Sequence, residues 1–185
     1  LLHVLDRDGA DLAMVVSPDI PELDYIASDA EWIERANRFT EQLAARASGR
    51  IAAACMVNPH FLDASLRAMD EYIGKHGFVM LGEMLQYFMD YRMHSDATAV
   101  VVRHAVALNV PVQVHISTSA RGTHPSTFGM EQLEDLFDLV EIIPDARYIL
   151  AHLVGELDDP PVAQQYFDAI EHQYGTWPDM FWMEI

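Results

Sequence analysis

Short apolar runs alternate along this chain with longer segments in which apolar positions recur every three or four residues. A short apolar run bounded by turn residues is typical of a buried strand, and the longer periodic segments are typical of helices packed on one face. The runs predict six strands at residues 12–16, 51–57, 78–86, 110–117, 147–151 and 180–185. The periodic segments predict five helices at residues 30–47, 62–75, 95–108, 130–140 and 162–174.

The helix predicted at residues 30–47 illustrates the helical pattern. We expect its buried side to carry Trp32, Ile33, Ala36, Phe39 and Leu43. Apolar residues at such spacings form a stripe that faces a core. The segment after the fourth strand, residues 118–129, is polar and contains glycine, and we expect a loop long enough to cover a site.

Strict alternation of strands and helices predicts a parallel sheet, which is either open or closed into a barrel. An open nucleotide-binding sheet needs a glycine-rich turn after its first strand, but Val16 is followed by Ser-Pro-Asp-Ile-Pro. The phosphate-binding patterns GxGxxG and GxxxxGK[ST] do not occur in the chain. We therefore predict an α/β fold of the (β/α)8 TIM-barrel type, represented by about six βα units in one domain spanning residues 1–185.

Three polar residues lie at the ends of predicted strands. His115 closes the run Val-Pro-Val-Gln-Val, His152 closes Tyr-Ile-Leu-Ala, and Glu83 interrupts the run that begins at Phe78. In a barrel the carboxyl ends of the strands surround one centre, where active sites are built. Imidazole and carboxylate groups are ordinary ligands of divalent metals, so we predict that Glu83, His115 and His152 bind one metal ion. A hydrogen-bonded core histidine is the alternative for each imidazole, and a buried ion pair or a residue at the site mouth without metal is the alternative for Glu83.

Composition and charge argue against some classes of binding partner. The chain of 185 residues has a formal net charge of −18 and is 51% hydrophobic. It offers no basic stripe for nucleic acid, and an anionic membrane surface would repel it. The single cysteine, Cys55, lies in an apolar run and rules out an internal disulfide. A membrane-spanning helix needs about 20 apolar residues, and no apolar run of the chain is close to that length. We therefore expect a cytoplasmic protein.

The motifs Val-Pro-Val-Gln-Val-His115 and Pro144-Asp-Ala-Arg-Tyr-Ile-Leu-Ala-His152 carry a resemblance to a known family. The chain resembles the amidohydrolase superfamily of metal-dependent TIM barrels, particularly the branch of amidohydrolase-related and aminocarboxymuconate-semialdehyde decarboxylase-like enzymes. The resemblance implies that these motifs are the fifth and sixth barrel strands and that both histidines are metal ligands. Leu81-Gly-Glu83 followed by Asp90-Tyr91 resembles the fourth strand of TatD-like relatives, in which a glutamate can bridge two metals.

Two parts of the family pattern do not appear in the sequence. The family's first strand ends in a His-x-His pair, and no such pair occurs in the chain. Its last strand supplies an aspartate, whereas this sequence reaches Ile185 at what corresponds to the seventh strand. A complete barrel takes about 250 residues. We therefore expect the barrel to lack its first and last strands here, as a portion of a longer chain.

The resemblance implies a divalent metal, Zn²⁺ first and Mn²⁺ second, and a small-molecule substrate. A metal-activated water could hydrolyse an amide, ester or lactone. The alternative activity is nonoxidative decarboxylation of an aromatic or muconate-like acid, and a third interpretation is a noncatalytic partial barrel. In the loop after His115, Arg121 could clamp a substrate carboxylate and His124 could transfer protons, although a solvated loop without such roles is the simpler interpretation of both residues. We expect a homo-oligomer, because open strand edges need cover.

Overall fold

The computed structural model describes residues 2–15, 30–116, 129–152 and 160–184 of the chain. The strands are β1 (Ala13–Val15), β2 (Ile51–Cys55), β3 (Met80–Met84), β4 (Val112–Val114), β5 (Tyr148–Leu150) and β6 (Phe181–Met183). The helices are α1 (Leu2–Asp8), α2 (Glu31–Ala45), η1 (Pro59–Phe61), α3 (Leu62–Ala68), η2 (Met69–Ile73), α4 (Gln86–Met89), α5 (Asp96–Ala107), α6 (Met130–Ile142) and α8 (Pro160–Tyr174).

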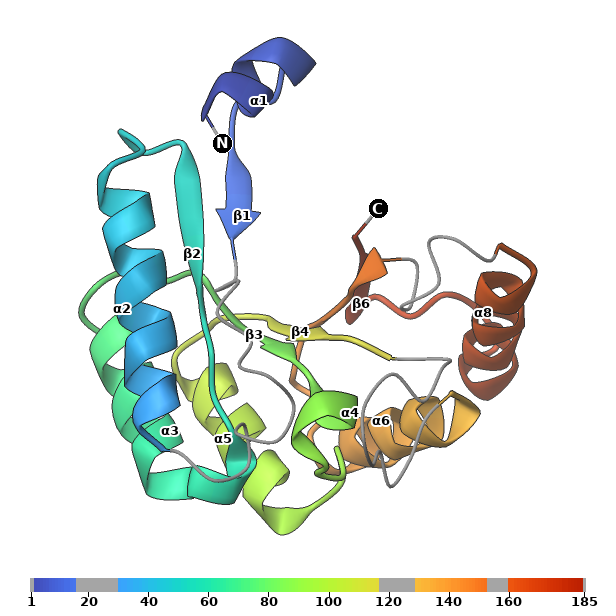
Figure 1. Ribbon diagram of the computed structural model, residues 1–185. Helices are drawn as coiled ribbons and strands as arrows, with labels where there is room; N and C mark the ends of the chain where they lie inside the picture. The colour runs from blue at the N-terminus through green and yellow to red at the C-terminus, as the bar shows by residue number, and fades with distance from the viewer. Residues whose placement is uncertain (1, 16–29, 117–128, 153–159, 185) are drawn as a thin grey trace.

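All six strands belong to one sheet in which every neighbouring pair is parallel and the spatial order follows the chain, β1 to β6. Figure 1 shows the sheet curled into an arc, with β1 and β6 at its two ends and the helices α2, α3, α5, α6 and α8 on its outer side. Sequential parallel order with helical crossovers is the arrangement of a TIM barrel. The predicted fold class is confirmed as a partial barrel.

Helix α2 packs on the end of β2 through a buried side-chain amide. Asn37 is fully buried; its Nδ2 donates to the carbonyl of Met56 at 2.8 Å, and its Oδ1 accepts from the Met56 N–H at 2.8 Å. The amide therefore satisfies both backbone polar groups of a residue just beyond the strand. Trp32, Ile33 and Ala36 are buried as predicted. The prediction for Phe39 was wrong: it is 46% exposed, because the buried stripe continues through Asn37 and Thr40.

The helix predicted at residues 62–75 changes its winding partway along. After α3 the turns widen into η2, a π-helix, in which the N–H of Gly74 donates to the carbonyl of Met69 at 3.1 Å. A Cβ atom at position 74 would lie 2.4 Å from the carbonyl oxygen of Asp70, so glycine leaves room for this turn. Periodicity predicted the helix but not its final geometry.

No helix among the described residues is both long enough and apolar enough to cross a membrane. Cys55 is buried at the end of β2, as expected for a structural thiol, and burial raises its pKa far above the usual value.

Candidate metal centre

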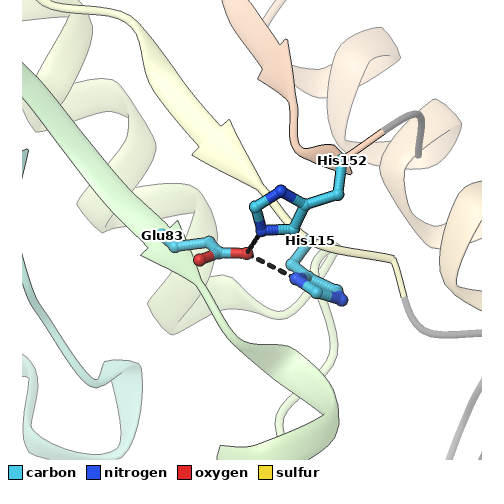
Figure 2. A group of neighbouring side chains, drawn as sticks. All are labelled: Glu83, His115 and His152. Carbon is cyan, nitrogen blue, oxygen red and sulfur yellow. Dashed lines mark hydrogen bonds and ion pairs between the residues drawn. The ribbon is translucent and has the colours of Figure 1, made fainter. Parts of the chain in front are cut away.

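Glu83, His115 and His152 come together on the inner side of the curled sheet. Glu83 is the penultimate residue of β3, His115 follows β4 directly, and His152 lies two residues beyond β5. Figure 2 shows the three side chains pointing toward one another, with one carboxylate oxygen of Glu83 facing both imidazole rings. The carboxyl ends of three successive strands therefore bring the predicted residues to one place.

The distances within this group are short. Nδ1 of His115 forms a hydrogen bond with Oε1 of Glu83, and Nε2 of His152 lies 3.6 Å from the same oxygen. The two rings meet edge to face with their centroids 5.3 Å apart. One ligand atom from each residue lies within 4.8 Å of the others. The exposed side-chain fractions are 10% for Glu83, 17% for His115 and 43% for His152, so the group is open on the His152 side.

An irregularity in β3 directs the side chain of Glu83 toward His115 and His152. Leu81 pairs with Val112 and Met84 with Val114, so β3 uses one more residue than β4 over the same stretch. Such an extra residue bends a strand and redirects a side chain, and bulges are common beside active sites. Gly82, within the bulge, has φ +118°, and a Cβ there would lie 2.6 Å from the carbonyl oxygen of Gln113. A glycine is therefore needed immediately before Glu83.

Sequence reasoning missed Glu184, which follows β6. Its Oε2 accepts a 2.7 Å hydrogen bond from Nε2 of Gln113 and lies 3.8 Å from Nδ1 of His152. His152 thus lies between two carboxylates, Glu83 on its Nε2 side and Glu184 on its Nδ1 side. The signal was present in the sequence, because Glu184 ends an apolar strand as His115 and His152 do.

Tyr91 is a further polar residue, and the charge of Glu83 influences its pKa. Its side chain is buried, and its hydroxyl has no hydrogen-bond partner among the described residues. Burial raises the pKa of Tyr91 well above its usual value, and the negative charge of Glu83 adds to the rise. Tyr91 is therefore a neutral phenol that can still donate a hydrogen bond.

A second group of potential ligands lies on the outer layer, where His94 approaches Asp135 and Asp138 of α6. Nδ1 of His94 is 3.1 Å from Oδ1 of Asp135 and 3.6 Å from Oδ2 of Asp138. Asp135 is only 2% exposed, and both of its oxygens accept hydrogen bonds from the guanidinium of Arg92. This cation already neutralises the buried carboxylate, so the group is a structural ion-pair network.

Arg121 and His124 are the remaining predicted site residues, and His60 and His104 are histidines outside the predicted site. Arg121 and His124 lie outside the described residues, and their predicted roles stay predictions. Nε2 of His60 donates to the carbonyls of Met89 at 2.8 Å and Asp90 at 3.2 Å, which ties η1 to the end of α4. His104 pairs with Asp70 at 2.7 Å on the helical layer.

The group formed by Glu83, His115 and His152 fits a divalent metal by the chemistry of its donors. Two imidazole nitrogens and a carboxylate oxygen are a common set for Zn²⁺, and the same donor types also serve Mn²⁺. The close approach of three such atoms on the inner side of a barrel-type sheet supports a shared cation better than three independent structural contacts.

A family model matches most of the chain. Residues 11–183 match the family model described as amidohydrolase. No curated protein matches the chain in sequence.

Solved structures match the fold at low sequence identity. The manganese complex of 5-carboxyvanillate decarboxylase from Novosphingobium aromaticivorans superposes with a TM-score of 0.64 at 16% identity, covering 100% of this chain and 57% of that one. For 2,6-dihydroxybenzoate decarboxylase from Rhizobium the TM-score is 0.61 at 17% identity, covering 84% and 56%. For 4-oxalomesaconate hydratase from Rhodopseudomonas palustris the TM-score is 0.67 at 14% identity, covering 98% and 56%. The chain spans little more than half the length of these relatives.

Proposed function

Because this chain belongs to the amidohydrolase family, we propose that Glu83, His115 and His152 bind a divalent metal ion in an enzyme that decarboxylates a small carboxylic acid without an oxidant. The observation that carries the proposal is the single Glu83 oxygen that faces both imidazole rings. Decarboxylation is favoured because structural relatives include a 5-carboxyvanillate decarboxylase and a 2,6-dihydroxybenzoate decarboxylase. Manganese in the first of them makes Mn²⁺ the first metal to test, with Zn²⁺ beside it.

A bound divalent cation would supply a Lewis acid that holds and polarises an oxygen of the substrate. The residues of this chain would hold the cation and the substrate. Glu83, His115 and His152 would fix the location of that cation. Arg121 is the proposed clamp for a carboxylate and His124 the proposed proton donor.

The reaction breaks the bond between the carboxyl carbon and its neighbour. A proton replaces the carboxyl group on that carbon, and the electron pair of the broken bond stays with the substrate as CO₂ leaves. An aromatic acid with a hydroxyl group beside the carboxylate suits this reaction, because electron donation from the hydroxyl oxygen helps the ring carbon accept the proton, and loss of CO₂ then restores the aromatic ring.

Hydrolysis of an ester, lactone or amide is the second candidate, supported by the amidohydrolase family match and by a donor set that suits an activated water. The two activities require the same metal and differ in product. A noncatalytic partial barrel would bind no metal at this centre.

The test uses the full-length protein, stripped of metal with a chelator and reloaded with Mn²⁺ or Zn²⁺. We expect the wild type to bind metal and His115→Ala and His152→Ala to lose more than about 10-fold in affinity while remaining folded, because each removes one of three donors. His104→Ala is the matched control, since His104 pairs with Asp70 on the helical layer. Full occupancy in both site variants would contradict the ligand assignment.

A panel of hydroxybenzoates, esters and lactones separates the two activities. CO₂ release that requires the added metal supports decarboxylation, and acid release from esters or lactones supports hydrolysis. A metal-loaded enzyme that releases acid and never CO₂ would overturn the decarboxylase proposal and leave the metal centre intact.

A further inference from the structure

His152 lies between two carboxylates, and only one of them belongs to the proposed metal-binding group. Nε2 faces Oε1 of Glu83 at 3.6 Å, while Nδ1 faces Oε2 of Glu184 at 3.8 Å. Both separations are longer than hydrogen bonds, so the contacts are electrostatic. His152 also has a left-handed backbone, with φ +50°, which is uncommon for a residue other than glycine and costs free energy.

Glu184 is held by two contacts that are independent of His152. Its N–H donates to the carbonyl of Leu150 at 3.0 Å, which extends the pairing of β6 with β5 and fixes the backbone. Its side chain accepts the 2.7 Å hydrogen bond from Gln113, a buried residue in the middle of β4. The carboxylate therefore has a fixed location beside the ring.

We propose that Glu184, held by Gln113, is a positioning residue that keeps the proton of neutral His152 on Nδ1, so that Nε2 is free to bind a metal. The inference rests on the proposed function, because it assumes that Nε2 is the ligand atom. A metal-binding imidazole must offer a lone pair on one nitrogen, and its other N–H is normally directed at a carboxylate or carbonyl. Glu184 places negative charge on the Nδ1 side, where it favours an N–H over a lone pair.

The structure offers a matched set of variants. Glu184→Gln removes the charge with little change in shape, and Gln113→Leu removes the donor that holds Glu184. Glu171→Gln makes the same charge change on the exposed side of α8 and serves as the control. Zn²⁺ is the probe, because it is diamagnetic and allows the histidine nitrogen resonances of the loaded full-length protein to be followed.

We expect Glu184→Gln to weaken Zn²⁺ binding by about 10- to 100-fold, the usual effect of losing a carboxylate behind a metal-binding histidine. Gln113→Leu should weaken binding in the same direction but less, and Glu171→Gln should leave it unchanged. The ¹⁵N resonances of His152, assigned by their absence from His152→Gln, should shift in Glu184→Gln with no matching change in thermal stability. A general structural role for Glu184 would not produce this local spectroscopic change.

The failures of the two proposals are distinguishable. If the wild type binds no Zn²⁺, the metal centre is wrong and the role of Glu184 is wrong with it. If the wild type binds Zn²⁺ through His152 while Glu184→Gln keeps full affinity and unshifted His152 resonances, the positioning role alone is overturned.

Discussion

The direction of the Glu83 side chain depends on Gly82. It combines φ +118° with a tight approach, since an added Cβ would lie 2.6 Å from the carbonyl oxygen of Gln113 and 3.1 Å from the backbone nitrogen of Met84. Both neighbours are backbone atoms of the sheet and cannot move without disturbing the pairing of β3 with β4. We predict that Gly82→Ala lowers the free energy of unfolding by at least about 1–3 kcal/mol, the usual cost of such a backbone conformation for a residue with a side chain.

Denaturant unfolding measures this loss, and Gly49→Ala provides the comparison. Gly49 also has a positive φ, +80°, but a Cβ there would meet no atom within 4 Å. Gly49→Ala therefore reports conformational strain without the steric clash. Equal losses of unfolding free energy in the two variants would show that the backbone of β4 shifts easily to make room for a side chain. Gly82 would then not be required for the shape of the site.

Asn37 joins two elements, because a helix side chain completes the hydrogen bonding of Met56 beyond β2. We predict that Asn37→Leu lowers the free energy of unfolding by about 2–4 kcal/mol, since it leaves the buried N–H of Met56 without a partner and its carbonyl with only the weak thiol contact from Cys55. Thr40→Val is the control: Thr40 is equally buried on α2, but among the described residues its hydroxyl bonds only to the carbonyl of Ala36 within the same helix. Chemical denaturation of both variants checks the prediction, and losses of similar size would contradict it.

The elements were predictable to the extent that they depend on hydrophobic pattern. Parallel strands buried on both faces produce continuous apolar runs, and this is why all six strands lie within their predicted ranges. The short helix α4 was not predicted, because residues 86–89 continue an apolar stretch that also suits a strand. Features that depend on single hydrogen bonds, such as the π-turn at η2, leave no periodic signal.

The candidate site was also predictable only where it follows from the hydrophobic pattern. Glu83, His115 and His152 could be found because polar residues at the ends of apolar strands are conspicuous, and a barrel places those ends together. The bulge that turns Glu83 inward could not be found, because it depends on the register between β3 and β4. Register is set by contacts between segments distant in sequence, and Gln113 acquires its contact with Glu184 only through that sheet order.

At the scale of the whole molecule, buried tyrosines link stability to alkaline pH. Burial and the hydrogen bond to Glu34 raise the pKa of Tyr72 to about 12. Burial also raises the pKa values of Tyr91 and Tyr148. In the unfolded chain a tyrosine titrates near about 10, so above that pH the unfolded state loses protons that the folded state keeps. The resulting contribution to stability is fully present below about pH 10 and is lost as the pH rises through the folded pKa values.

We therefore predict that the free energy of unfolding falls steadily from about pH 10 to about pH 12, as the unfolded state ionises the tyrosines that burial keeps protonated in the folded state. Denaturant unfolding at several pH values measures the slope, and phenolate absorbance in native conditions shows that the buried tyrosines remain protonated. Tyr72→Phe removes one titrating group and should make the slope shallower, although the lost bond to Glu34 lowers stability at neutral pH. An unchanged slope in this variant would mean that Tyr72 ionises as easily in the folded protein as in the unfolded chain, and that its burial does not govern alkaline stability.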